Sequence, residues 1–151
     1  MTSETGPSTP RNRGVGMLII TAYGIFAVSA TARALYQILV HFDDAPVAYS
    51  LSAFAALVYV FATLALARTS TAAWRAALVA VLIEMVGVLT VGSWTFLNPT
   101  LFPEATVWSH FGQGYGFVPL VLPFLGLYWL WRHRPSRNLP SGVPRTGMGT
   151  D

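Results

Sequence analysis

The chain has 151 residues, of which 54% are hydrophobic and only 10% are charged. An average soluble domain is about a quarter charged, so this chain has too few charged side chains to cover a water-facing surface. The net charge of +3 comes from arginines in short polar segments between apolar runs, which excludes the clustered basic surface of a nucleic-acid-binding protein. The absence of cysteine excludes disulfides, thiolate metal sites and thiol redox catalysis.

Long apolar segments predict an all-α integral membrane protein, a four-helix bundle. A transmembrane helix needs about 20 predominantly apolar residues, and these continuous runs lack the alternation of a membrane β-barrel. In chain order, the predicted spans are 16–40, 47–67, 76–97 and 112–131, and the last of them has an alternative start near Phe117. Together they predict one transmembrane domain over 15–131, between polar cytoplasmic tails at 1–14 and 132–151 that we expect to be disordered.

The charged residues between the spans predict how the chain is oriented in the membrane. Arginines occupy both tails and the second loop, whereas the first and third loops carry Asp43, Asp44 and Glu104. Because arginine-rich loops remain in the cytoplasm, both termini are expected on the cytoplasmic side of the cell inner (plasma) membrane. Tryptophan and tyrosine near the ends of the spans are typical of the two membrane interfaces, and we expect Trp108 at the outer one.

The N-terminal segment has a second interpretation, a cleaved secretory signal peptide. Arginines, an apolar stretch and Ala30-Thr31-Ala32 follow one another in the required order, and cleavage after Ala32 would leave three spans. The apolar run that begins at Val15 is longer than the usual signal-peptide core of about 7–15 residues. Apolar residues also resume after Arg33, which favours an uncleaved transmembrane helix.

Glu84 is the first candidate functional residue, because an ionisable side chain near the middle of a span is costly and usually faces protein or water. Ala77, Ala80 and Gly87 make its side of the helix small, which suits close packing against another helix. Desolvation disfavours the charged form of such a carboxyl. Its role is either proton or cation coupling, or the fixing of helix packing, and we favour packing.

Arg33 is the second candidate, because it interrupts the first span. Its guanidinium either extends to the outer interface or pairs with Glu84 inside the membrane. At a rise of about 1.5 Å per residue, the two residues differ in depth by about 12 Å, so a pair would require a tilted or shifted helix. We therefore favour the interface.

Other polar residues are weaker candidates. His41 and His110, with the three acidic residues of the outer loops, have the chemistry of a divalent-metal site, but their spacing matches no ligand motif. Tyr59 and Thr63 form a polar line on the second span, where threonine commonly bonds to a carbonyl of its own helix. We expect solvated loops and ordinary helix packing, with no metal and no cofactor.

Glycine and proline mark the fourth span. Gly112 and Gly116 lie at the spacing of closely packed helices, at a flexible entry into the span. Pro119 and Pro123 are expected to kink the helix that follows, because each removes a backbone donor and crowds the preceding turn.

Three segments carry a resemblance: HFDDAP at 41–46, LFPEATVWS at 101–109 and FGQGYGFVPLVLP at 111–123. With the order of the spans, they resemble small four-span integral membrane proteins of actinobacterial type. The resemblance covers 15–131 and implies the four-span fold, but neither an activity nor site residues. Small multidrug resistance transporters also have four helices and one membrane glutamate, but theirs is in the first helix and Glu84 is in the third span.

The sequence favours a non-enzymatic accessory or structural component of the membrane. The expected partners are the lipid bilayer and either further copies of the chain or a larger membrane complex, with no nucleic acid. The alternative is a small proton-coupled transporter or channel that uses Glu84. A third hypothesis is an outer-face metal or haem enzyme that uses His41 and His110.

Overall fold

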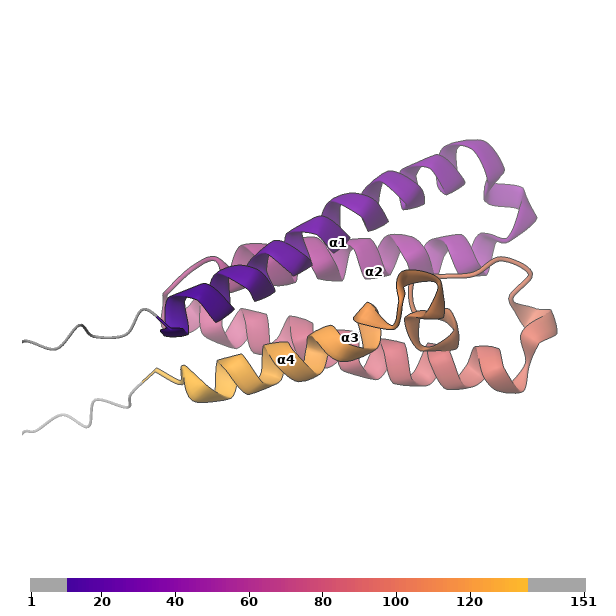
Figure 1. Cartoon of the computed structure of the whole chain (residues 1–151). Helices are drawn as coiled ribbons and strands as arrows, with labels where there is room; N and C mark the ends of the chain where they lie inside the picture. The colour runs from indigo at the N-terminus through magenta and orange to yellow at the C-terminus, as the bar shows by residue number, and fades with distance from the viewer. Residues whose placement is uncertain (1–10, 136–151) are drawn as a thin grey trace, which may run out of the picture.

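A computed structural model describes residues 11–135 of the chain (Figure 1). Its four long helices are α1 (Arg11–His41), α2 (Pro46–Leu66), α3 (Thr71–Leu97) and α4 (Val118–Arg132). No strand occurs in this part of the chain, and the predicted all-α bundle is confirmed. Most of the predicted tails, 1–10 and 136–151, lies outside the described residues, and α1 begins inside the segment predicted as the N-terminal tail.

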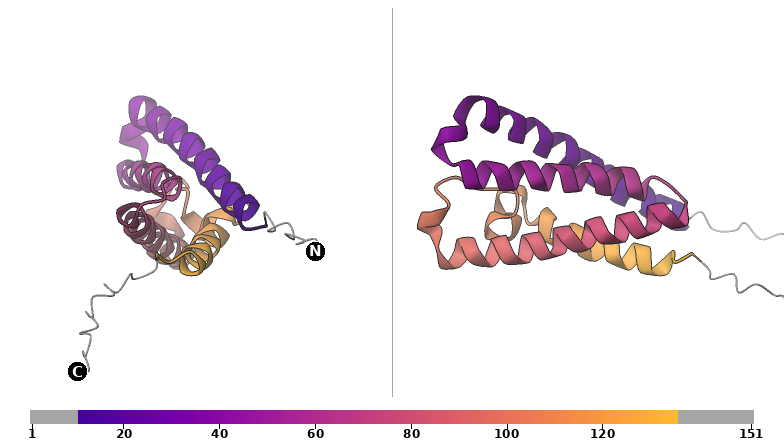
Figure 2. Two further views of the ribbon diagram at one scale, coloured as in Figure 1. Left: turned by 90° about the vertical axis from the view of Figure 1, so that its left-hand side faces the viewer. Right: turned by 180° about the vertical axis from the view of Figure 1, so that it is seen from behind.

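The four helices form an antiparallel bundle in which α2 packs between α1 and α3, and α4 packs on both α3 and α1 (Figure 2). The first turn of α1 and the last turn of α4 lie at the same end, together with the connection from α2 to α3 (Figure 1). We name this the arginine-rich end, after Arg68, Arg75, Arg132 and Arg134. The opposite end, which carries Asp43, Asp44 and Glu104, is the acidic end.

The turns between helices follow from local sequence. Pro46 occupies the first turn of α2, where a missing N–H removes no helical hydrogen bond. Ser70 caps α3, because its Oγ accepts a hydrogen bond of 3.1 Å from the backbone N–H of Ala73. α2 therefore begins and ends within one residue of its predicted span. α3 ends at the predicted residue and begins five residues earlier than predicted.

The bundle has small residues inside and large apolar residues outside. Buried alanines line the helix contacts: Ala27, Ala30, Ala34, Ala55, Ala56, Ala62, Ala77 and Ala80. Large side chains such as Leu18, Val28 and Leu57 are about two-thirds exposed or more, at 71%, 72% and 68%. Close approach through small residues, with bulky apolar groups facing outward, is typical of helices packed within lipid. Three helices are long and apolar enough to cross a membrane, and a fourth crossing results if the bent segment around α4 counts as one span.

The N-terminal half of α1 contributes to this core. α1 continues without a break past Ala32 and Arg33, and Ile19, Tyr23 and Ala27 are buried against the other helices. Cleavage after Ala32 would remove these contacts.

Of the two predicted starts of the fourth helix, the one near Phe117 is confirmed and the one near 112 is wrong. α4 begins at Val118 and has 15 residues. A 3-10 segment, η3 (Ser109–Tyr115), precedes it at an angle of 100°. Gly112 and Gly116 have φ values of 80° and 63°, and a right-handed helix cannot run through this left-handed backbone. These glycines therefore shape a turn instead of spacing two packed helices.

The prolines have different positions from those expected. Pro119 lies in the first turn of α4, where it removes no intrahelical bond, so the kink expected there is wrong. Pro123 alone lies inside the helix, and it is buried.

Residues 105–117 fold back from the acidic end into the bundle, and we call them the re-entrant segment (Figure 1). Thr106 Oγ1 accepts from the backbone N–H groups of Trp108 and Ser109 at 3.2 and 3.1 Å, and Ser109 Oγ accepts from that of Thr106 at 2.9 Å. Irregular backbone at membrane depth is tolerated where protein encloses it. Trp108 is only 1% exposed, so the prediction that it marks the outer interface is wrong.

Candidate functional site

Glu84 lies at the middle of α3, and its side chain is fully buried inside the bundle. The hydroxyls of Tyr23 from α1 and Tyr59 from α2 approach its carboxyl. Nε1 of Trp108, from the re-entrant segment, approaches the hydroxyl of Tyr59. We call these four residues the buried polar cluster. It joins three helices and the re-entrant segment at one point.

Packing around the cluster leaves little space. The rings of Tyr23 and Tyr59 lie 6.2 Å apart between their centroids. A Cβ atom at Gly87, one turn after Glu84, would lie 2.6 Å from Cζ3 of Trp108, so the indole rests directly on the backbone of α3. A Cβ atom at Gly126 of α4 would lie 3.1 Å from the hydroxyl of Tyr23. The absence of a side chain at both glycines therefore allows the aromatic groups to reach the centre of the bundle.

The polar atoms of the cluster are close together without full hydrogen-bond geometry. Both carboxyl oxygens of Glu84, the two tyrosine hydroxyls and Nε1 of Trp108 are buried and have no partner within bonding geometry. Buried polar groups normally have a partner. A carboxylate can accept from both hydroxyls, and a carboxylic acid can donate to one of them, so small side-chain rotations satisfy either protonation state.

The cluster is closed to the surface. Glu84, Tyr23 and Tyr59 are 0% exposed and line none of the five cavities described among residues 11–135, whereas Trp108 lines one of these, between α2 and α3. Trp108 covers the side of the cluster that faces the acidic end, because its ring packs on Gly87, which lies one turn beyond Glu84 in that direction. A solute therefore has no open route to the carboxyl in this conformation.

Arg33 does not pair with Glu84. It is exposed on α1, and its Nη1 donates a 2.9 Å hydrogen bond to the hydroxyl of Tyr115. Its Nη2 donates to the carbonyl oxygen of Ala105 at 3.4 Å, and the guanidinium lies 5.8 Å from the ring centroid of Tyr115. Arg33 thus attaches α1 to both ends of the re-entrant segment.

The attachment of α1 through Arg33 predicts a measurable coupling. Arg33→Gln and Tyr115→Phe should each weaken the bundle, and a double-mutant cycle should give a coupling free energy of about 1 kcal/mol. Unfolding of the detergent-solubilised protein by denaturant measures it. The matched control is Arg132 with Tyr128, an arginine–tyrosine pair at 3.1 Å within α4 itself, where about 0.3 kcal/mol is expected. Additive effects of the two Arg33–Tyr115 substitutions would contradict the attachment.

The candidate metal ligands at the acidic end lie in separate contacts. Nδ1 of His41 lies 3.1 Å from Oδ2 of Asp44. His110 packs its ring 5.5 Å from that of Phe96, and its backbone N–H donates to Thr95 Oγ1 at 2.8 Å. Within residues 11–135, no three side chains of the metal-binding types come together. The structure therefore does not bring the two histidines into one site.

Sequence reasoning found Glu84 but not its neighbours. Thr63 bonds to the carbonyl of Tyr59 at 2.7 Å, as predicted, but the hydroxyl of Tyr59 faces the carboxyl. The distance of each residue from the end of its apolar run could have shown that Tyr23 and Tyr59 lie near Glu84. Tyr23 and Glu84 each lie eight residues after the start of their apolar runs, and Tyr59 lies eight residues before the end of its run. In antiparallel helices these positions share one level of the membrane.

Comparison of the chain with family models, curated proteins and solved structures gave no match. The function is therefore argued from two features of the molecule. One is the closed polar cluster around Glu84, and the other is the apolar outer surface of the bundle.

Proposed function

We propose that the protein is a non-catalytic multi-pass component of the cell inner membrane, with an accessory or structural role. The enclosure of Glu84 carries this proposal. It is the one buried acidic or basic side chain of the described residues, and catalysis or transport would require a route to it. Polar groups between membrane helices commonly stabilise a defined packing. The cluster fixes the bundle, and the bundle acts through its surface.

The surface between α1 and α2 has the form of a helix-binding groove. Gly24, Thr31 and Ala32 line it from α1, where their small side chains leave space, and Val60 and Leu64 line it from α2. Small residues that leave a groove in an apolar surface favour close association with a further membrane helix. This supports an assembly either of several copies of the chain or with a larger complex.

Mild-detergent purification with mass spectrometry and mass photometry tests the role. We expect a stoichiometric assembly that Ala32→Trp disrupts, because the indole would fill the groove. Val121→Trp is the matched control, since this exposed residue of α4 lines none of the five cavities. A protein that stays monomeric and without a partner, or an assembly insensitive to Ala32→Trp, would contradict the proposed surface role.

A second candidate function is proton-coupled transport, and one observation favours it. The Glu84 carboxyl lies beside two hydroxyls that can satisfy it with or without a proton. Proton flux into proteoliposomes separates the candidates. The structural role predicts no flux above that of empty liposomes, whereas coupled transport predicts a flux that Glu84→Gln abolishes and Glu104→Gln preserves.

Orientation can be tested because the chain contains no cysteine. We expect tags on both termini to report the cytoplasm, and Asp44→Cys to react with a membrane-impermeant maleimide in intact cells. Arg68→Cys should react only after permeabilisation. Labelling of Arg68→Cys in intact cells would show that the protein has the opposite orientation. The intact mass of the same protein decides whether the chain is cleaved after Ala32.

A further inference from the structure

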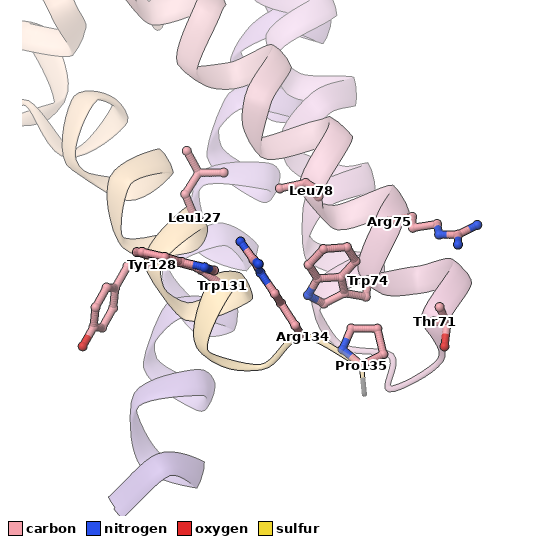
Figure 3. Close-up of a pocket in the computed structure, with 9 residues that line it drawn as sticks. All are labelled: Thr71, Trp74, Arg75, Leu78, Leu127, Tyr128, Trp131, Arg134 and Pro135. Atoms are coloured by element: carbon pink, nitrogen blue, oxygen red, sulfur yellow. The ribbon is translucent and has the colours of Figure 1, made fainter. Parts of the chain in front are cut away.

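A groove of about 930 Å³ opens between α3 and α4 at the arginine-rich end (Figure 3). Trp74 from α3 and Trp131 from α4 stand on its two sides. Leu78 and Leu127 line it one turn further into the bundle. The groove therefore changes from polar and aromatic at the membrane surface to more aliphatic at greater depth, where Tyr128 is its remaining aromatic residue.

The polar part of the groove carries positive charge, and no acidic side chain of residues 11–135 lines it. Arg134 lies 5.5 Å from the ring centroid of Trp131 and points into the space between the two tryptophans, whereas Arg75 lines the groove beyond Trp74 and extends away from that space (Figure 3). The acidic residues of 11–135 lie at the opposite end or, in Glu84, at the centre of the bundle. The charge of the groove is therefore complementary to an anion from outside the protein.

The groove has a rigid wall. Nε1 of Trp74 donates a 2.9 Å hydrogen bond to the carbonyl oxygen of Leu130, which lies in the last turn of α4. The last carbonyls of a helix lack intrahelical partners, so this bond satisfies one of them and joins the two helices. A groove that is formed before its ligand arrives loses less conformational entropy on binding.

We propose that this groove binds an anionic membrane phospholipid. Arg134 holds the phosphate, Arg75 adds positive charge beside the groove, and an acyl chain lies along Leu78 and Leu127. Basic pockets between transmembrane helices on the cytoplasmic side recognise anionic head groups, and tryptophan is enriched at that level of the bilayer. A free anion would use only the outer part of the groove, whereas a phospholipid matches both parts. The inference rests on the membrane location of the bundle and is independent of whether the protein is catalytic.

Native mass spectrometry of the full chain in a neutral detergent tests the proposal. Phosphatidylglycerol and phosphatidylcholine with identical acyl chains are titrated, and phosphatidylglycerol should bind more tightly. Arg75→Gln with Arg134→Gln should weaken phosphatidylglycerol binding about thirtyfold, because each basic residue near an anionic lipid contributes about fivefold. Arg68→Gln with Arg132→Gln removes the same charge at the same end, outside the groove, and should change binding less than about threefold.

Three results would contradict the proposed phospholipid site. Equal losses of phosphatidylglycerol affinity in the two double variants would indicate general electrostatic attraction to the arginine-rich end. Equal binding of phosphatidylcholine, which has the same phosphate but no net charge, would show that the groove does not recognise the negative charge of the head group. Displacement of the lipid by millimolar inorganic phosphate would indicate a site for a soluble anion. Leu127→Trp, which fills the deep part of the groove and leaves all arginines in place, should also abolish lipid binding, and retained binding would exclude the acyl-chain position.

Discussion

Gly87→Ala is expected to destabilise the bundle by about 1–3 kcal/mol, which is the usual cost of an extra methyl group in a packed core. The new Cβ would lie 2.6 Å from Cζ3 and 2.7 Å from Cη2 of Trp108. Neither partner can move freely, because Gly87 belongs to a long helix and the indole is 1% exposed. The shift in the denaturation midpoint of the detergent-solubilised protein measures the loss.

Gly24→Ala is the matched control for this substitution. Gly24 is also a glycine in a membrane helix, but the nearest atom to its added Cβ would be Cγ2 of Thr63 at 3.7 Å, an ordinary contact. Alanine has a higher helix propensity than glycine, so Gly24→Ala should be neutral or stabilising by up to about 1 kcal/mol. Trp108→Leu should recover part of the stability lost in Gly87→Ala. An equally stable Gly87→Ala protein would show that Trp108 does not pack against α3.

The sequence was sufficient to predict the helices whose ends carry local signals. α2 begins at Pro46, and α3 ends directly before Asn98. Hydropathy together with these start and stop signals therefore predicted the ends of both helices to within about five residues. The burial of Glu84 could also be predicted, because a carboxyl in the middle of a span must face protein or water. The helix ends depend on residues nearby in the sequence, and the burial of Glu84 depends on the lipid environment of its helix, so neither requires knowledge of long-range contacts.

The re-entrant segment could not be predicted in this way, because long-range contacts determine it. His110 and Phe117 adopt φ values of 50° and 61°, which non-glycine residues rarely do without tertiary support. Such support comes from Thr95 of α3, whose Oγ1 accepts from the backbone N–H of His110. Trp108 likewise belongs to a loop that hydropathy places outside the membrane, so counting depths along spans finds Tyr23 and Tyr59 but not Trp108.

Glu84→Ala is expected to cost about 2–4 kcal/mol of unfolding free energy. The substitution leaves a cavity at the centre of α3 and removes the shared partner of the Tyr23 and Tyr59 hydroxyls, which are then buried without any nearby acceptor. Glu84→Gln keeps the volume and one acceptor oxygen, and its NH2 group can donate to a tyrosine hydroxyl, so its cost should stay below about 1 kcal/mol. Denaturant unfolding in detergent measures both.

The size of the loss in Glu84→Ala should depend on the two hydroxyls. If the cluster acts as a packing device, Tyr23→Phe and Tyr59→Phe introduced together should cost less in a Glu84→Leu protein than in the parent, since no buried polar partner is then left behind. Equal costs in the two backgrounds would show that the carboxyl and the hydroxyls do not interact. A Glu84→Gln protein that is as unstable as Glu84→Ala would require an ionised carboxylate, which an amide cannot replace, and would shift the balance toward proton-coupled transport.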